Sequence, residues 1–421
     1  MRVLIDTKKR VRSVLDELDR LAELEFPYPD SKLAIDKLRS SYQETYDELE
    51  NLDALNDLSA VRQRCRTAVE EIYEHLPYLG FILRSTDVRN AFEAFGPLLR
   101  LAGNILEPNV APESRKTRLL MSSEWRYSPF IFHSPKGLSG FVLIGLPATE
   151  SANPLLLPLT GHELGHTAWI RKNLEEKYQA IARDRTYEEV KKTWANFREA
   201  FPGAGETPET VNALFMAQTW GRAAEWALSQ ARETFCDFFG LLIFGSSYIK
   251  AFSYFLSPGF GKRSQGYPEM SARVVNLTTA ARSFDIEVAE EMVDRFEVEK
   301  KTNGSFSDRY LLKLADETLK TFIGGLIEEV KQSINIDSRI PLSSEEEVRR
   351  ILTRYRDMVP AEDCKTMADI LNAAWLANDD ETLYNEPPAL KDRKSEVLKE
   401  LCLKNLEVFE IEQRLAEDWR V

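Results

Sequence analysis

The sequence has few cysteines and lacks a long apolar run. Its four cysteines lie far apart in 421 residues, without Cys-x-x-Cys spacing, which argues against a disulfide scaffold. The most apolar stretch, 238–256, is interrupted by Gly245, two serines and Lys250. A membrane-spanning helix needs about 20 mainly apolar residues. We therefore expect a reduced, cytoplasmic protein with no membrane span.

An excess of basic residues is also absent. The formal net charge is −13, and the lysines and arginines are interleaved with acidic residues. Because no basic stripe offers a footprint for a phosphate backbone, we expect no nucleic-acid partner. The first residues, MRVLIDTKKRVRSVLDEL, carry charges where a signal peptide has its apolar core, so they predict an amphipathic helix rather than export.

The hydrophobic spacing predicts an α+β protein that is mostly α-helical. A helical period dominates 1–107, and short apolar runs on either side of Ser134–Gly137 predict a small antiparallel sheet. From about 155 the period is helical again. We expect an N-terminal helical region at 1–107, a catalytic core at 108–280 with a helical insertion at about 171–225, and a C-terminal helical region at 281–421.

The segment His162-Glu-Leu-Gly-His166 carries the clearest chemistry. Two histidines four residues apart lie on one face of a helix, so both imidazoles can reach one zinc ion. Glu163 lies beside them and can act as general base toward a metal-bound water. With only four histidines in the chain, about 0.004 such matches are expected by chance.

A catalytic zinc site needs a third protein ligand. The other histidines, His75 and His133, lie upstream, which leaves a carboxylate. Glu233 and Asp237 are four residues apart on a largely apolar helix. Glu233 can bind the ion while Asp237 accepts the outer N–H of a zinc-bound histidine. Glu225 is the competing third ligand.

His162-Glu-Leu-Gly-His166 followed by Glu233-x-x-x-Asp237 resembles the gluzincin zinc peptidases. The resemblance implies a zincin-like catalytic core with zinc held by His162, His166 and Glu233. It also implies that Glu163 is the general base and that Asp237 accepts a hydrogen bond from a zinc-bound histidine. The separation from His166 to Glu233 is 233 − 166 = 67 residues, longer than in compact members, which points to the insertion at about 171–225.

A downstream segment extends the resemblance. Tyr267-Pro-Glu-Met-Ser-Ala-Arg273 is similar to the His-Pro-x-x-x-x-Arg segment of the CAAX prenyl proteases and heat-shock membrane proteases, with tyrosine in place of histidine. The resemblance covers about 140–275 and implies that Tyr267 and Arg273 face the substrate near zinc. Both could stabilise negative charge on a carbonyl oxygen. Tyr248 and Tyr254 are alternatives.

Together these patterns predict a zinc-dependent peptidase that acts on a peptide or protein substrate. The strand at 141–146 is either an exposed edge that pairs with an extended peptide or a strand buried on both faces. Two other functions remain open: a helical interaction or regulatory protein with a structural or vestigial zinc site, and a zinc amidohydrolase for a non-peptide amide. The sequence does not specify an oligomeric state.

Overall fold

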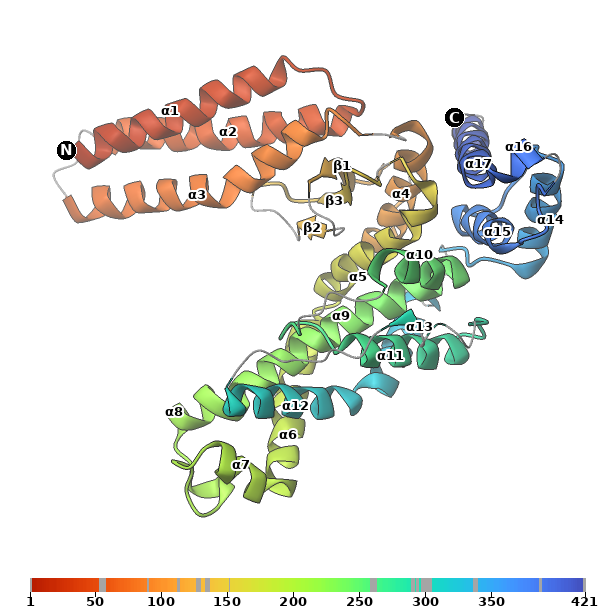
Figure 1. The fold of residues 1–421 in the computed structure, drawn as a ribbon. Helices are drawn as coiled ribbons and strands as arrows, with labels where there is room; N and C mark the ends of the chain where they lie inside the picture. Colours follow the sequence, from red (N-terminus) through yellow and green to blue (C-terminus); the bar gives the residue numbers. More distant parts are fainter. Residues whose placement is uncertain are drawn as a thin grey trace. The chain divides into compact units, whose positions relative to one another are not determined.

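A computed structural model gives the fold of the chain (Figure 1). It describes residues 2–52, 58–88, 91–111, 114–125, 130–132, 137–150, 152–257, 263–288, 292, 295–296, 305–335, 340–385 and 388–418. These residues are mostly helical, as expected. The chain divides into two compact units, Met1–Gly103 with Asn109–Asn153, and Asn104–Pro108 with Pro154–Val421. This division groups the strands with the N-terminal helices, and its limits differ from those expected at 107 and 280.

The first unit contains three long helices, α1 (Arg2–Ala22), α2 (Pro29–Asn51) and α3 (Leu58–Arg84), followed by α4 (Ala91–Leu106). They form because apolar residues recur at helical spacing and become the buried faces of the bundle. Pro29 opens α2, where its missing N–H costs no hydrogen bond. Asp30 then accepts a hydrogen bond of 3.1 Å from the backbone N–H of Leu119, which ties α2 to the sheet.

The sheet is mixed, and the expectation of an antiparallel sheet is wrong for its two longer strands. The strand order is β1-β3-β2, with β1 (Arg118–Glu124) parallel to β3 (Phe141–Pro147) and β2 (Phe130–Phe132) antiparallel to β3. The prediction placed the apolar runs before and after Ser134–Gly137 in one hairpin. Instead β1 ends at Glu124 and lies on one side of β3, while the short strand β2 lies on the other side. Most of the expected turn, 134–136, lies outside the described residues.

The strand β3 is the central strand of this sheet. All seven of its residues are buried, and its backbone pairs with β1 on one side and with β2 on the other. The proposal that this strand offers an exposed edge to a peptide is therefore wrong. Its uninterrupted apolar sequence reflects burial on both faces, which was the alternative interpretation.

In the described residues of the second unit, the regular secondary structure is all helical. Its elements are η3 (Pro154–Leu159), α5 (Thr160–Arg171), α6 (Leu174–Lys192), α7 (Trp194–Ala200), η4 (Pro208–Thr210), α8 (Ala213–Met216), the π-helical η5 (Ala217–Gly221), α9 (Arg222–Phe244), α10 (Ser246–Leu256), α11 (Met270–Ser283), α12 (Phe306–Lys320), α13 (Ile323–Asn335), α14 (Glu345–Arg356), α15 (Met367–Asp379), α16 (Pro388–Lys391) and α17 (Lys394–Asp418). Among the described helices, none has the length and apolar character needed to cross a membrane.

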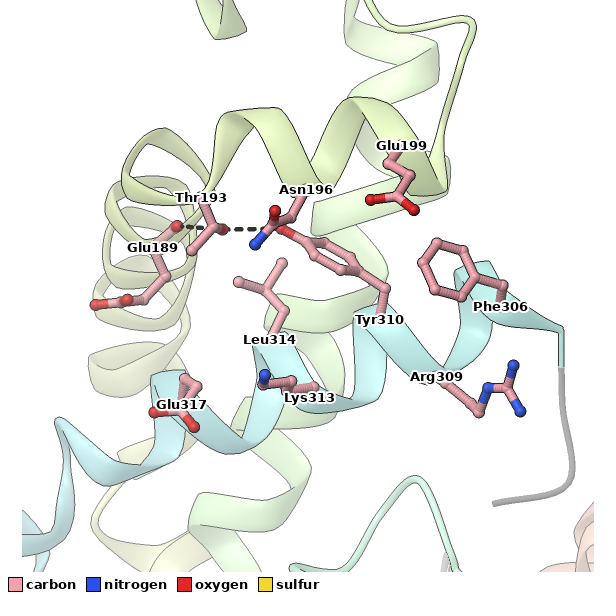
Figure 2. Close-up of a pocket in the computed structure, with 10 residues that line it drawn as sticks. All are labelled: Glu189, Thr193, Asn196, Glu199, Phe306, Arg309, Tyr310, Lys313, Leu314 and Glu317. Atoms are coloured by element: carbon pink, nitrogen blue, oxygen red, sulfur yellow. Dashed lines mark hydrogen bonds between the residues drawn. The ribbon is translucent and has the colours of Figure 1, made fainter. Parts of the chain in front are cut away.

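The segment expected as an insertion is helical and packs with α12. Phe197 and Trp220 form part of an apolar core with Leu311 and Leu314 of α12. At the edge of this core a cavity of ≈ 390 Å³ opens between α6, α7 and α12 (Figure 2). The phenol of Tyr310 crosses it and lies 2.9 Å from the hydroxyl of Thr193.

Helix α15 forms hydrogen bonds at the end of α9 and just before the start of α5, the two helices that carry the predicted site. The Asn372 side-chain amide donates to the Phe244 carbonyl at 2.9 Å and accepts from the Ser247 N–H at 2.7 Å. It thereby bridges the break between α9 and α10, where Gly245 has φ of 61°. One turn later, the Trp375 indole N–H donates to the Leu155 carbonyl at 2.9 Å, just before α5.

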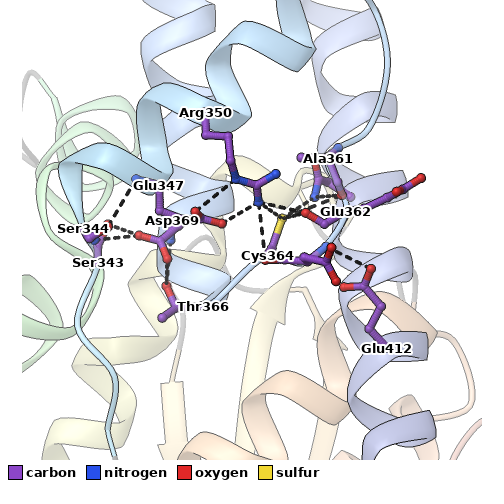
Figure 3. A network of polar contacts seen from close by, with 12 residues as sticks. Ser343, Ser344, Glu347, Arg350, Ala361, Glu362, Cys364, Thr366, Asp369 and Glu412 are labelled. Atoms are coloured by element: carbon purple, nitrogen blue, oxygen red, sulfur yellow. Dashed lines mark hydrogen bonds and ion pairs between the residues drawn. The ribbon is translucent and has the colours of Figure 1, made fainter.

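A polar network joins α14 to α15 (Figure 3). The Asp369 carboxylate accepts hydrogen bonds from the Ser343 hydroxyl and the Ser344 N–H, both at 2.8 Å, and from the Thr366 hydroxyl at 2.7 Å. Ser344 is the N-cap of α14, and its hydroxyl accepts from the Glu347 N–H. The network fixes α15, and with it Asn372 and Trp375.

Candidate metal centre

Small residues allow α5 and α9 to pack with their backbones close together. A Cβ built on Gly161 would lie 2.7 Å from the Cα of Gly240, and one on Gly165 would lie 2.8 Å from the Cα of Cys236. Real Cβ atoms do not approach other atoms so closely, so both positions on α5 require glycine. This close crossing brings the histidines of α5 to the carboxylates of α9.

The three predicted zinc ligands meet at this crossing. Glu233 Oε2 lies 3.2 Å from His162 Nε2 and 3.7 Å from His166 Nε2. The two imidazole rings are 4.9 Å apart and nearly perpendicular. All three side chains are buried. Glu225, the competing ligand, is exposed two turns earlier on α9, about 12 Å along the axis.

Two of the separations between the predicted ligand atoms match those around a zinc ion. Tetrahedral zinc with bonds of about 2.0 to 2.1 Å places neighbouring ligand atoms roughly 3.3 to 3.4 Å apart. The separations of 3.2 and 3.7 Å from Glu233 to the two histidines are close to that spacing. When the histidines are protonated, Glu233 is also an ion-pair partner of both imidazoles.

The structure adds a donor that the sequence analysis missed. Potential ligand atoms of His162, His166 and Cys236 all lie within 4.8 Å of one another. Burial, followed by the charge of Glu233, raises the pKa of the Cys236 thiol well above its usual value. The thiol is therefore neutral unless a metal ion deprotonates it. The sequence could have indicated this donor, because Cys236 directly precedes Asp237 on the helix that carries Glu233.

Asp237 is the centre of a buried hydrogen-bond cluster. Its Oδ1 lies 2.8 Å from His162 Nδ1 and accepts from the Tyr248 hydroxyl, also at 2.8 Å. Arg273 makes two further contacts, from Nε to Oδ2 at 2.6 Å and from Nη2 to Oδ1 at 2.8 Å. Burial opposes ionisation of Asp237, but the nearby Arg273 and His162 hold its pKa well below the usual range.

The protonation of the cluster follows from the same contacts. Burial alone would lower the pKa of His162, but its hydrogen bonds to Asp237 and Glu233 raise it to about 10. Burial would likewise raise the pKa of Glu233, yet the bond to His162 lowers it to about 2. Without a metal ion, His162 is thus a cation held between two carboxylates, and a divalent cation can take over that role.

Glu163 does not take part in the hydrogen bonds that join His162, Glu233 and Asp237. It is buried, and within the described part of the chain its carboxylate has no hydrogen-bond or ion-pair partner. Burial, with some help from the charge of Glu233 and against the effect of His162, raises its pKa to about 7. A carboxyl group that titrates near neutral pH can both accept and release a proton.

Tyr267 and Arg273 both reach the site, but in different ways. Tyr267 is 41 % exposed, and burial of its phenol together with the charge of Glu233 raises its pKa. Arg273 is only 9 % exposed, with its guanidinium on Asp237 and 5.2 Å from the Tyr267 ring centroid. Tyr267 is therefore the residue with solvent access beside Glu233, whereas Arg273 lies behind the predicted ligands.

The remaining described candidates have partners other than the three predicted ligands. The Tyr248 hydroxyl is fully buried on Asp237, and Tyr254 packs edge-on to Trp375. His75 belongs to the first unit, where its Nδ1 lies 3.0 Å from the Tyr42 hydroxyl. His133 is outside the described residues.

Comparison with known proteins finds no matching family model, no similar curated protein and no similar solved structure. Conclusions about function therefore depend on the residues of this centre alone.

Proposed function

We propose that this chain is a zinc-dependent peptidase whose metal ion is held by His162, His166 and Glu233. The observation that supports this most directly is the approach of Glu233 Oε2 to both histidine Nε2 atoms, at 3.2 and 3.7 Å. When bound, zinc would polarise a substrate carbonyl and lower the pKa of a water to about 7. Two histidines with one glutamate leave a coordination position free for that chemistry.

Glu163 is the proton carrier in this proposal. A peptide bond breaks when water adds to the carbonyl carbon and the amine leaves with an added proton. Glu163 would accept the proton from the attacking water and deliver it to the leaving nitrogen. Its burial beside His162 and a pKa of about 7 support both steps at neutral pH. The absence of an ion-pair partner among the described residues keeps its carboxylate available.

Tyr267 is the proposed donor to the developing oxyanion. Negative charge accumulates on the carbonyl oxygen as water adds, and a hydroxyl aimed at that oxygen stabilises the charge. The raised pKa of Tyr267 keeps the phenol protonated, so that it remains a donor at neutral and alkaline pH. The peptide substrate is inferred from the gluzincin-like pattern of His162, Glu163, His166, Glu233 and Asp237.

The position of Cys236 favours one alternative, a structural zinc site. If Cys236 bound the ion along with His162, His166 and Glu233, four protein ligands would close the coordination sphere. Closed sites of this kind stabilise folds and do not activate water. The chain would then be a helical interaction protein.

The test combines metal content with peptide cleavage. Purified protein is expected to contain one equivalent of zinc and to cleave members of a peptide library. Glu163→Gln should keep the zinc and reduce cleavage by about 10² to 10⁴-fold, because the general base is lost. Glu176→Gln, at an exposed position on the next helix, is the matched control and should behave like the wild type.

Three results would decide against the proposal. Bound zinc without cleavage, or with cleavage that survives Glu163→Gln, would favour the structural site. Cleavage of small non-peptide amides alone would favour an amidohydrolase. Protein that binds no zinc would remove the basis of both hydrolase functions and leave a helical interaction protein with a vestigial site.

A further inference from the structure

We infer that Arg273 and Tyr248 are positioning residues of the metal centre, which act through Asp237 on the orientation of His162. This differs from the substrate-facing role that the family resemblance implies for Arg273. The inference uses the metal site of the proposed function, but it does not require the bound ion to hydrolyse a peptide.

The first argument is the number of bonds on Asp237. Its two carboxylate oxygens receive two contacts from Arg273, one from Tyr248 and one from His162, all between 2.6 and 2.8 Å. Asp237 is 1 % exposed, so water cannot replace any of these donors. Charge-assisted two-point contacts from arginine fix the plane of a carboxylate more tightly than a single donor does.

The second argument concerns the tautomer of His162. A carboxylate at 2.8 Å from Nδ1 keeps a proton on that nitrogen and leaves the Nε2 lone pair for a metal ion. Nε2 is also the atom that faces Glu233. The contacts from Arg273 and Tyr248 stop the Asp237 carboxylate from rotating, and such a rotation would release the imidazole.

The third argument is that Arg273 has little capacity left for a substrate. Its Nε and Nη2 are both used on Asp237. The aromatic rings of Phe252 and Tyr267 lie against the guanidinium, with centroids 4.9 and 5.2 Å from its central carbon. Arg273 therefore contacts both the Asp237 carboxylate and the ring of Tyr267.

The fourth argument is charge balance. Glu163, Glu233 and Asp237 place three carboxyl groups in one buried centre. Arg273 compensates Asp237, and Arg232 Nε lies 3.7 Å from Oε1 of Glu233. Removing one partner of a buried ion pair leaves an uncompensated charge in a medium that solvates it poorly. Loss of Arg273 should therefore disturb Asp237 and the metal site together.

The experiment compares four variants in the full-length chain: Arg273→Gln, Arg273→Lys, Tyr248→Phe and Tyr267→Phe. Zinc affinity is measured by competition with a chelator, and the visible spectrum of the cobalt-substituted protein reports ligand geometry. Arg273→Gln should weaken zinc binding by about 10 to 100-fold, the range for outer partners of metal-bound histidines. Arg273→Lys should recover part of the loss, and Tyr248→Phe should show a smaller loss in the same direction.

Tyr267→Phe distinguishes a residue that positions the metal ligands from one that contacts the substrate. It should lower zinc affinity less than Arg273→Gln does, because the phenol interacts with Glu233 but leaves the contact between Asp237 and His162 in place. Where cleavage is measurable, its kcat should fall. Arg282→Gln, an exposed arginine on the same helix α11, is the control and should match the wild type in every measurement.

The inference is overturned if Arg273→Gln binds zinc as the wild type does while KM rises or kcat falls, because that pattern assigns Arg273 to the substrate. If Arg273→Gln does not fold, Tyr248→Phe decides, since it removes one hydroxyl and keeps the ring. Wild-type zinc affinity with an unchanged cobalt spectrum in Tyr248→Phe would then contradict the inference. Absence of peptide cleavage in the wild type affects only the proposed function.

Discussion

Gly165 lies directly against Cys236 where α5 crosses α9. A Cβ on Gly165 would lie 2.8 Å from the Cα and 3.2 Å from the Cβ of Cys236. Because both obstacles belong to a helix backbone or to an atom attached to it, they cannot rotate away. The spacing between the histidines of α5 and the carboxylates of α9 therefore depends on the missing side chain at position 165.

Gly165→Ala should accordingly damage both stability and metal binding. Overpacking of this kind costs typically about 1 to 3 kcal/mol, and a shift of α5 also moves His162 and His166. The measurements are urea unfolding and zinc affinity. Gly324→Ala is the control, since an added Cβ there meets nothing within 4 Å and alanine favours a helix by up to about 1 kcal/mol. Tight zinc binding by Gly165→Ala would show that the close crossing is not needed.

The third ligand can be tested by removing one donor at a time. We expect Glu233→Ala to lose zinc, because its carboxylate lies against both histidines. Cys236→Ala should keep zinc, since the proposed site is complete without the thiol. The cobalt-substituted wild type should also lack the near-ultraviolet band of a thiolate ligand. Zinc loss in Cys236→Ala, or a thiolate band in the wild type, would instead favour a closed structural site.

Asn372 provides a test of how α15 supports the site helices. Asn372→Leu removes the partners of the Phe244 carbonyl and the Ser247 N–H, both of which are bonded across the α9–α10 break. A buried polar group left without a partner costs about 1 to 3 kcal/mol. Urea unfolding should show that loss, whereas Asn378→Ala, at a partly buried position of α15 whose amide donates to Asp379 at 3.4 Å, should unfold nearly as the wild type. Equal stability of the two variants would refute the bridging role.

Glu347 gives a prediction for pH. Hydrogen bonds from Arg350, at 3.1 Å from Nε and 2.5 Å from Nη2, lower the pKa of this carboxyl below its usual value, against the effect of burial (Figure 3). The folded state thus favours the ionised form. This contribution is complete above the unfolded pKa of about 4.3 and disappears as pH falls through the lower folded value.

Glu347→Gln should therefore be less stable than the wild type at pH 7. The difference in urea midpoint should shrink as pH falls below about 4. Glu346→Gln, its exposed neighbour on α14, serves as control. A difference that stays constant from pH 7 to pH 3 would mean that the charge of Glu347 is not what stabilises α14.

Much of the secondary structure follows from local pattern, and the direction of the strands does not. Apolar spacing is enough to predict the long helices, because burying one face stabilises a helix whatever it packs against. The apolar runs before and after Ser134–Gly137 indicate strands for the same reason. The direction of β1 relative to β3 depends on how the chain reverses between the strands, and no local pattern encodes that choice.

For the candidate site, too, local sequence predicts one part and the tertiary structure decides the rest. The proposed roles of His162, Glu163 and His166 follow from their spacing, since residues four apart share a helix face. Tertiary structure selected Glu233 over Glu225, because only Glu233 lies opposite His162 on α9. It also brought Cys236 against the histidines and turned Arg273 onto Asp237. Those three outcomes depend on how α5, α9 and α11 cross, and crossing geometry is set by side chains distant in sequence, with Gly165 among them.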